Sequence, residues 1–394
     1  MSELAVPACK EKAASAALFS RRHFLKLSGA CAGLVLSGSA SLLSGCDFLR
    51  GNLRTVTDMG GRSVAVPETI ERVFCSNPIG TVDIYALDPN LLVGWNFRPV
   101  GDNRKYIPEI YLNLPTLGVW MGSGATPNDE EIVRQSPDAI LCYWTADEVG
   151  CDMASSVRDE TGVATLLIDY DIRSCAEMFR YIGPLLNRED RANELAKFCE
   201  AKLDYIAQCT SAVPESERKS VYIAQGVGGL STDPVGSMHV TDALELINTD
   251  NVAYLPGTKG QGMGMPTVNL EQIITWNPDA VLVSEYSMSD SESSDLYGEI
   301  TADEDWKNVP CVREGHVYRM PQSPFAWFGR PPSVMRLLGC LLVLKLLYPD
   351  YTADIDIVSE TREFYKLFLR IELSDSELLA ILETAGADVS SLVS

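Results

Sequence analysis

Histidine and cysteine are the residues of this chain that could hold a transition metal or serve as nucleophiles. Only three histidines occur, at positions 23, 239 and 316, and none of the eleven cysteines forms a Cys-x-x-C pair. A site for bare zinc or manganese draws on several imidazole, thiolate or carboxylate ligands held close together. The sequence therefore argues against such a site, and also against a zinc knuckle or a thioredoxin-like redox centre.

Catalytic motifs are missing as well. The sequence contains no Gly-x-Ser-x-Gly nucleophile turn and no His-Glu-x-x-His pair. The glycine-rich stretches at 226–229 and 257–265 lack the spacing of dinucleotide-binding and phosphate-binding loops. We therefore predict a protein that carries out no catalysis.

The N-terminus carries a chemical signal of another kind. Residues 20–26 read Ser-Arg-Arg-His-Phe-Leu-Lys, and small apolar residues fill 27–45. This order resembles a twin-arginine export signal. The stretch ends in Leu-Ser-Gly-Cys, which resembles a lipobox, so Cys46 is expected to receive a lipid before cleavage. We predict anchoring to the outer face of the cytoplasmic membrane; an uncleaved membrane anchor is the alternative.

The chain that must position any binding residue is long and acidic. Its 394 residues, 46% of them hydrophobic, exceed one ordinary core and predict two lobes. The formal net charge of −22 opposes the basic surface that non-specific nucleic-acid binding requires. We expect no nucleic-acid partner, and we expect a monomer.

Short apolar runs alternate with amphipathic segments along both halves of the chain. In the first half, the candidate strands are 72–75, 91–94, 139–143 and 165–168. In the second half, they are 220–224, 280–283 and 316–319. Strands that alternate with helices predict an α/β fold with a largely parallel sheet in each half.

A sequence repeat relates the two halves. Residues 128–141 and 269–282 share an Asn, a Glu, an Ile and a Pro-Asp-Ala run at matching positions. Each copy is typical of a capped helix, a Pro-Asp break and a buried strand. A single recurrence is too few for a solenoid and instead indicates two related lobes.

One strong helical pattern lies between the halves. An apolar stripe from 192 to 206 predicts a helix over 190–208, about 30 Å long. Such a rod could connect two lobes stiffly, or it could lie on one lobe alone. We assign a signal (1–45), a tether (46–53), an N-terminal α/β lobe (54–172), a linking helical segment (173–213) and a C-terminal α/β lobe (214–394).

These features together resemble the substrate-binding proteins of ABC importers for iron–siderophore, haem and cobalamin-type ligands. The segments 56–67, 72–74, 315–320, 331–338 and 347–350 add to the resemblance, which covers roughly 54–370. It implies two Rossmann-like α/β lobes joined by a single long α-helix. It also implies modest closure of the lobes over a chelate, followed by delivery to a permease dimer.

Glu130 and Glu271 are the third residues of the two repeat copies. In the family, one glutamate on each lobe engages arginines of the permease, and the resemblance assigns that role to these two residues. A symmetric partner can recognise the distance between two equivalent carboxylates, one on each lobe, by forming charge-assisted hydrogen bonds to both. The alternative is a carboxylate that only stabilises the first turn of a helix.

Ligands of such folds bind where the strand ends of the two lobes face each other. Aromatic rings there could cover a planar chelate, and arginines could pair with its anionic groups; packing in the core is the alternative for each aromatic. The candidates are Asn77, Trp95, Arg98, Trp120, Tyr143, Trp144, Gln225, Tyr254, Glu285, Tyr286, Phe325, Trp327 and Arg330. His239 could ligate haem iron, but a lone histidine is more often a hydrogen-bonded loop residue.

The sequence therefore predicts a lipid-anchored binding protein that delivers an Fe(III)–siderophore, haem or a corrinoid to an ABC permease, with no cofactor of its own. The alternatives are a ligand-sensing receptor and a binding protein for another metal or an oxyanion.

Overall fold

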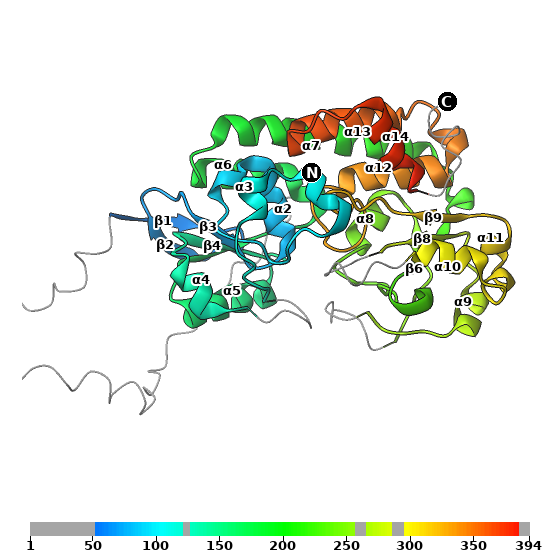
Figure 1. Ribbon diagram of the computed structural model, residues 1–394, viewed down its shortest axis with the longest axis horizontal. Helices are drawn as coiled ribbons and strands as arrows, with labels where there is room; N and C mark the ends of the chain where they lie inside the picture. Colours follow the sequence, from blue (N-terminus) through cyan, green and yellow to red (C-terminus); the bar gives the residue numbers. More distant parts are fainter. Residues whose placement is uncertain (1–51, 121–126, 257–264, 286–294, 386–394) are drawn as a thin grey trace, which may run out of the picture.

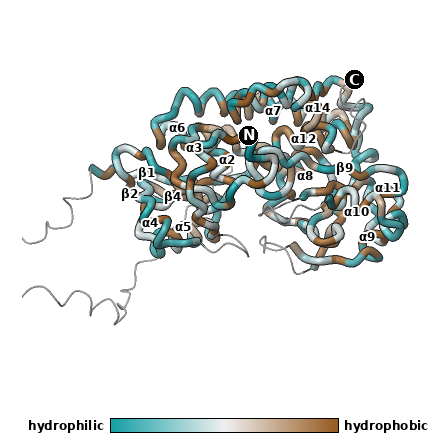
Figure 2. The backbone as a smooth tube through the Cα atoms, viewed as in Figure 1, coloured by the Kyte–Doolittle hydropathy of each residue, from teal (hydrophilic) through white to brown (hydrophobic). Residues whose placement is uncertain are grey.

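The computed structural model describes residues 52–120, 127–256, 265–285 and 295–385, which form two α/β lobes side by side (Figure 1). The two lobes and the long helix between them confirm the predicted fold class. Figure 2 shows hydrophobic residues concentrated inside both lobes and hydrophilic ones on the outer helices and loops.

The N-terminal lobe is built on a parallel sheet of three strands in the order β3-β4-β5. An antiparallel hairpin, β1-β2, precedes the sheet. The strands are β1 (Leu53–Thr57), β2 (Ser63–Pro67), β3 (Val73–Cys75), β4 (Ala139–Tyr143) and β5 (Thr165–Ile168). The helices are α2 (Pro78–Leu87), α3 (Glu109–Leu112), α4 (Asp129–Arg134), α5 (Glu148–Thr161) and α6 (Cys175–Leu185), with the 3-10 helix η3 (Gly101–Tyr106).

The C-terminal lobe is built on a parallel sheet of four strands in the order β7-β6-β8-β9. The strands are β6 (Ser220–Ala224), β7 (Asp250–Asn251), β8 (Ala280–Val283) and β9 (Val317–Arg319). The helices are α8 (Thr241–Leu246), α9 (Leu270–Trp276), α10 (Leu296–Ala302), α11 (Pro310–Arg313), α12 (Arg336–Leu347), α13 (Ile357–Phe364) and α14 (Asp375–Glu383), with a π-helix, η9 (Tyr365–Leu369).

Most of the predicted strands are present. Strands β4, β5 and β8 are buried at every position, as expected for strands covered on both faces. The strand predicted at 91–94 is wrong. A 3-10 turn occupies Pro89–Leu91, and the described chain just beyond it forms the isolated β-bridges Val73–Leu92 and Trp95–Thr116 in place of a continuous strand.

The sequence repeat corresponds to a repeated structural unit. Asn128 caps α4 by accepting a hydrogen bond from the Glu131 N–H, and Asn269 caps α9 in the same way. In the first copy, Asp138 accepts the backbone N–H groups of residues 71 and 72, next to the start of β3. In the second copy, Asp279 accepts the N–H of Ser220 at the start of β6. Each Pro-Asp break therefore fastens two neighbouring parallel strands, which is a structural role.

The long helix predicted between the lobes is α7 (Glu189–Ala212). It contacts α6 and α2 of the N-terminal lobe and α8 and α12 of the C-terminal lobe. Its Lys202 pairs with Glu360 of α13 at 2.6 Å. The helix is therefore packed along both lobes and is not a free-standing rod.

The C-terminal segment returns to the N-terminal lobe, which the sequence did not predict. Arg370, in a left-handed conformation, donates hydrogen bonds of 2.8–2.9 Å to the carbonyl oxygens of Tyr85, Ala86 and Leu87. These are carbonyls of the last turn of α2, which a helix leaves unpaired. A helix of the first lobe is therefore completed by a residue near the end of the chain.

Asp83 of α2 is a buried carboxyl beneath the contact between the lobes. Burial raises its pKa to about 7, although a hydrogen bond from the Val334 N–H and the charge of Arg336 oppose the shift. The unfolded value is near 3.8. Between about pH 4 and pH 7, the folded protein thus holds a proton that the unfolded chain has lost. The contribution of Asp83 to stability therefore falls as the pH rises through this window and levels off above it.

We predict that Asp83→Asn flattens this pH dependence. The asparagine can still accept the Val334 hydrogen bond but cannot ionise, so the variant should gain up to about 4 kcal/mol over the wild type between pH 4 and pH 8. Urea denaturation at each pH measures the free energy of unfolding. The control is Asp204→Asn on the exposed face of α7; parallel wild-type and Asp83→Asn profiles would contradict the prediction.

Candidate functional site

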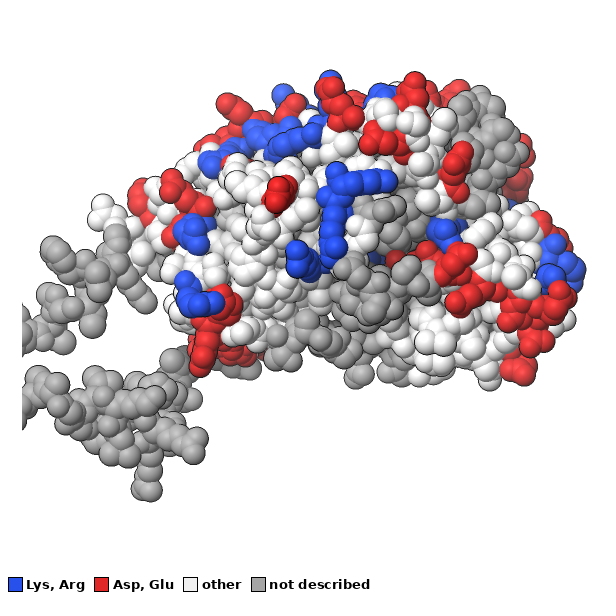
Figure 3. Space-filling view, in the orientation of Figure 1, with Lys and Arg blue, Asp and Glu red and all other residues white. Residues whose placement is uncertain are grey.

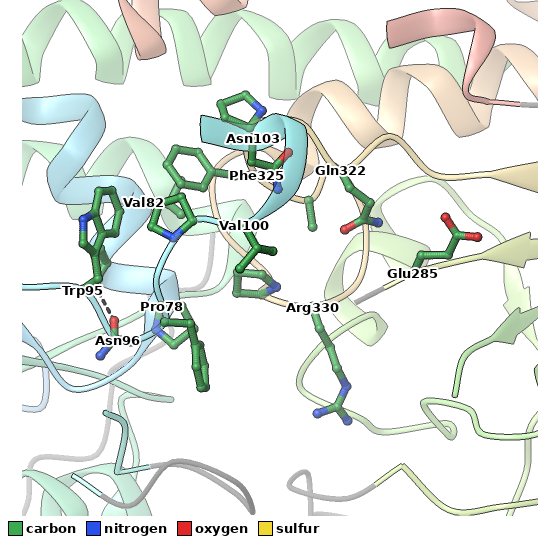
Figure 4. Close-up of a pocket in the computed structure, with 16 residues that line it drawn as sticks. Pro78, Val82, Trp95, Asn96, Val100, Asn103, Glu285, Gln322, Phe325 and Arg330 are labelled. Carbon is green, nitrogen blue, oxygen red and sulfur yellow. Dashed lines mark hydrogen bonds between the residues drawn. The ribbon is translucent and has the colours of Figure 1, made fainter. Parts of the chain in front are cut away.

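A cavity of about 150 Å³ lies between the two lobes (Figure 4). The N-terminal lobe contributes the start of α2 and the segment 95–103, and the C-terminal lobe contributes Glu285 and the segment 322–331. The cavity therefore lies where the carboxyl ends of the strands in the two lobes meet, the usual ligand position in open α/β sheets.

Aromatic rings form the apolar wall of the cavity. Trp95 is fixed by a 2.7 Å hydrogen bond from its indole Nε1 to the carbonyl oxygen of Tyr111. Phe325 crosses from the C-terminal lobe and places its ring 6.4 Å from Trp95 and 5.7 Å from Tyr85, centroid to centroid. The wall thus joins both lobes and is held rigid before any ligand binds.

Two polar side chains on the N-terminal side of the cavity were not predicted. The Thr81 hydroxyl donates a 2.5 Å hydrogen bond to the side-chain Oδ1 of Asn96. The Asn96 amide in turn donates to the backbone carbonyls of Cys75 and Gly118, both at 2.9 Å. The position of Asn96, directly after Trp95, was the one sequence signal that could have identified it.

The charged groups of the cavity come from the C-terminal lobe, and each has an oppositely charged partner. Arg330 binds the buried Asp233 through Nη2 at 2.7 Å and Nε at 3.2 Å. The Glu285 carboxylate lies 3.3 Å from Nε of Arg319 and accepts the Tyr297 N–H at 3.2 Å. Burial raises the pKa of Glu285, and the Arg319 charge opposes this.

The structure brings four of the predicted ligand residues together at the cavity: Trp95, Glu285, Phe325 and Arg330. Arg98 is exposed beside the lining residues Phe97 and Pro99. Their role in binding stays a prediction.

The other candidates lie elsewhere. Tyr143 and Trp327 are fully buried in the core, so packing accounts for both of them. Asn77 is also buried; it caps α2 and donates to the carbonyl of Tyr143 at 2.8 Å. Gln225 is buried beside Gly329, and Tyr254 is 58% exposed on the surface.

Trp120 and Trp144 belong to the packing of the N-terminal lobe. Trp120 donates from its indole to Glu160 and packs on Phe74, and Trp144 packs against a small cluster around Cys151. His239 is buried in the loop that carries Asp233. Tyr286 and Cys46 lie outside the described residues.

Glu130 and Glu271 occupy equivalent positions on the two lobes. Each is exposed and stands in the first turn of its helix, α4 or α9. Both helices lie on the side of the molecule away from α7 (Figure 1). The two carboxylates are thus presented on one side by helices with matching caps.

Comparison with known proteins shows what the chain is similar to. A family model described as periplasmic binding protein matches residues 152–324. A solved structure, an ABC transporter solute-binding protein from Sulfurospirillum deleyianum, is 29% identical and superposes with a TM-score of 0.74. The match covers 84% of this chain and 99% of that one. The chain is thus similar to periplasmic binding proteins in sequence and in fold.

Two curated relatives of this chain carry different ligands in their names. The molybdate-binding protein MolA of Haemophilus influenzae is 25% identical over 84% of this chain and 95% of its own length. The high-affinity heme uptake system protein IsdE of Staphylococcus aureus is 22% identical over 56% of this chain and 71% of its own length. These relatives and the solved structure are binding proteins by name, and the chain is similar to them over most of its length.

Two kinds of feature are absent from the described residues. No helix there combines the length and the apolar character needed to cross a membrane. No cluster of three or more His, Cys, Asp or Glu side chains in those ranges could hold a metal ion.

The contrast between two tryptophans yields a prediction. Ligand binding should quench the fluorescence of Trp95 in the cavity wall but not that of Trp144. Trp95→Phe should therefore lose most of the ligand-dependent quenching seen in the wild type, and Trp144→Phe, the matched control, should retain it. Equal loss in both variants would mean that the ligand binds away from this cavity.

Proposed function

We propose that this protein is a periplasmic binding protein that is lipid-anchored through Cys46 and captures an anionic organic metal chelate, of the Fe(III)–siderophore or haem class, for an ABC permease. The observation that carries the proposal is a cavity between the lobes with an aromatic wall (Trp95, Phe325) and a guanidinium group (Arg330). Aromatic faces favour an organic ligand with flat apolar surface, and the guanidinium favours its anionic oxygens.

The charge distribution around the cavity supports an anionic ligand. On a chain with net charge −22, Arg98 just before η3 and Arg104 and Lys105 within it outnumber the single acidic residue of the segment 98–105, Asp102. The neighbouring positions 99, 100 and 103 line the cavity. Figure 3 shows basic side chains along the middle of this face, with acidic ones towards both flanks. Local positive charge in an acidic protein attracts anions to the opening between the lobes.

A second candidate ligand is an inorganic oxyanion of the molybdate type. The molybdate-binding relative aligns with 84% of this chain, whereas the haem-uptake relative aligns with 56%. The same basic groups would serve an oxyanion, but the aromatic wall would then have no partner. For that reason the organic chelate is our first proposal, and a corrinoid remains a further member of the organic class.

Titration of the protein without its signal (residues 47–394) tests the ligand class. Ferric siderophores, haem, cobalamin and molybdate would each be added while tryptophan fluorescence is followed. Saturable quenching by an organic chelate would support the first proposal. Saturable binding of molybdate alone would establish the second candidate, and no response to any of these ligands would overturn both.

Delivery is proposed to use Glu130 and Glu271 as contacts to permease cations. The double variant Glu130→Lys/Glu271→Lys should bind ligand as the wild type does. It should stimulate permease ATPase activity or uptake at least about tenfold less, which corresponds to about 1.4 kcal/mol of docking energy. The measurement is ligand-dependent ATPase activity of the permease in liposomes.

The matched control is Glu189→Lys/Asp204→Lys on α7, which changes the net charge equally on the opposite side of the molecule. Equal loss of stimulation in the two double variants would show a general charge effect and would refute specific docking.

A further inference from the structure

We propose that Cys175 of α6 and Cys199 of α7 form a dithiol site that is oxidised to a disulfide and then ties the long linking helix to the start of α6. Neither cysteine belongs to the residues that line the cavity, so the site does not depend on which ligand the protein captures. Proteins that work outside the cytoplasm, as the proposed function requires, meet oxidants that form and maintain disulfides.

The two cysteines face each other across a helical hairpin. Helix α6 ends at Leu185, α7 begins at Glu189, and the two helices pack against each other. Asn187, in the turn between them, has a φ of +54°, a left-handed conformation suited to a tight turn. Cys175 and Cys199 are equally far from Asn187 in the sequence. Because both helices rise by about 1.5 Å per residue, the two cysteines lie at the same level of the hairpin.

Contacts closer to the turn support this antiparallel register. A Cβ built on Gly183 of α6 would lie 2.4 Å from the Cβ of Ala192 on α7. Farther from the turn, Arg180 of α6 donates to both carboxylate oxygens of Glu200 on α7, at 2.5 and 2.6 Å. The glycine and the alanine let the helices approach closely, and a disulfide requires such an approach because its two Cα atoms are only about 5.5–6 Å apart.

Both thiols lie on the helix faces that meet. Cys175 shares its buried face with Phe179 and Ile182, and Cys199 shares its own with Leu195. Burial raises the pKa of the Cys199 thiol well above its usual value, and the side-chain interaction with Cys175 raises it further. Both cysteines are free thiols in this structure. Two free thiols thus lie side by side in the interior, on neighbouring helices.

A third buried cysteine, Cys340 of α12, lies near this pair. Burial raises the pKa of its thiol, with a smaller contribution from the charge of Cys175. Its Sγ donates a hydrogen bond of 3.8 Å to the carbonyl oxygen of Ala243, within the C-terminal lobe. Because Cys199 interacts directly with the side chain of Cys175, we expect Cys199 to be its partner, and a disulfide between Cys175 and Cys340 is the competing outcome.

The oxidant is a low-molecular-weight disulfide such as oxidised glutathione. The Cys175 thiolate attacks one sulfur of the oxidant and forms a mixed disulfide; the thiolate that leaves takes up the proton that Cys175 lost. The Cys199 thiolate then attacks the Cys175 sulfur, and the second leaving thiolate takes up the proton of Cys199. Two protein thiols are thereby oxidised to a disulfide, and the oxidant is reduced to two thiols. Cys175 reacts first because it begins α6 and is 4% exposed, whereas Cys199 is fully buried.

The disulfide would join α7 to a point where the chain contacts the other lobe. The residues directly before Cys175 bind α8: the Ile172 N–H donates to Asp242 at 2.9 Å, and Arg173 pairs with Glu245 at 3.0 Å. A bond from Cys175 to α7 therefore restrains the junction between the lobes. It also closes a loop of the unfolded chain, so the oxidised protein should be the more stable form.

Disulfide mapping of the full-length protein in detergent tests the site. The reduced protein is incubated with oxidised glutathione in urea just below its unfolding midpoint, where local opening admits the oxidant. It is then alkylated in concentrated urea and digested with trypsin without reductant. The tryptic peptides 174–180 and 198–202 each contain one of the two cysteines. They should be joined in most molecules and separate after treatment with dithiothreitol. Alkylation of both cysteines, or a link from Cys175 to the peptide of Cys340, overturns the site.

Thermal unfolding tests the structural effect of the bond. Oxidation should raise the melting temperature of the wild type by about 3 °C or more, and Cys199→Ala should lose this rise. If Cys199→Ala does not fold, Cys175→Ala, at the end of its helix, provides the same comparison. The matched control is Cys311→Ala, at another buried free cysteine, which should keep both the joined peptides and the rise. Joined peptides without a rise in the wild type, or equal loss of the rise in the control, would overturn the stabilising role.

These results are independent of the ligand titration. A map without the joined peptides would leave the proposed function standing, and a protein that binds none of the tested ligands could still form this disulfide.

Discussion

The shared interior of the two lobes is the constraint on which the rest of the structure depends. One cluster of buried apolar side chains extends from the strands of the first sheet to those of the second. At its centre, the fully buried Arg336 of α12 pairs with Asp242 of α8, and Asp242 also accepts the Ile172 N–H just beyond β5. Removing either partner would leave a buried charge unpaired, which is far more costly than breaking a surface ion pair. The lobes therefore meet through contacts that tolerate only small displacements.

The wall of the cavity is part of this contact between the lobes and is held in place by it. Phe325 of the C-terminal lobe packs against Tyr85 and Trp95 of the N-terminal lobe, so the aromatic wall is completed across the boundary. The charged groups instead belong to one lobe and are held by partners within it. Both lobes therefore define the shape of the cavity, whereas the charged side chains that line it come from the C-terminal lobe. The N-terminal lobe adds basic side chains near the opening. A binding site prepared in this way loses little conformational entropy when the ligand arrives.

Sequence reasoning succeeded where a local pattern is enough. Buried parallel strands appear as short apolar runs, the capped repeat marks equivalent helices, and the apolar stripe of α7 fixes its length to within a few residues. Sequence reasoning could not tell which of the aromatic residues that follow a strand fill the core and which line the cavity. Tyr143 and Trp95 both follow or end apolar runs, yet one fills the core and the other lines the cavity. That difference depends on packing between segments far apart in the chain, such as Phe325 against Trp95. The same limit hid Asn96, whose side chain binds the hydroxyl of Thr81 and the backbone carbonyls of Cys75, at the end of β3, and of Gly118.

The cap that Arg370 provides for α2 bears on how this architecture can be divided. The sequence repeat suggests two modules, each with its own sheet, that could be exchanged between relatives to recombine ligand preferences. But the last turn of α2, the helix whose start lines the cavity, is finished by a guanidinium from near the other end of the chain. A chimera that took only the first lobe from another protein would therefore pair its α2 with a foreign cap. A functional exchange would have to transfer the first lobe together with the segment around Arg370, so the two halves are not interchangeable as separate modules.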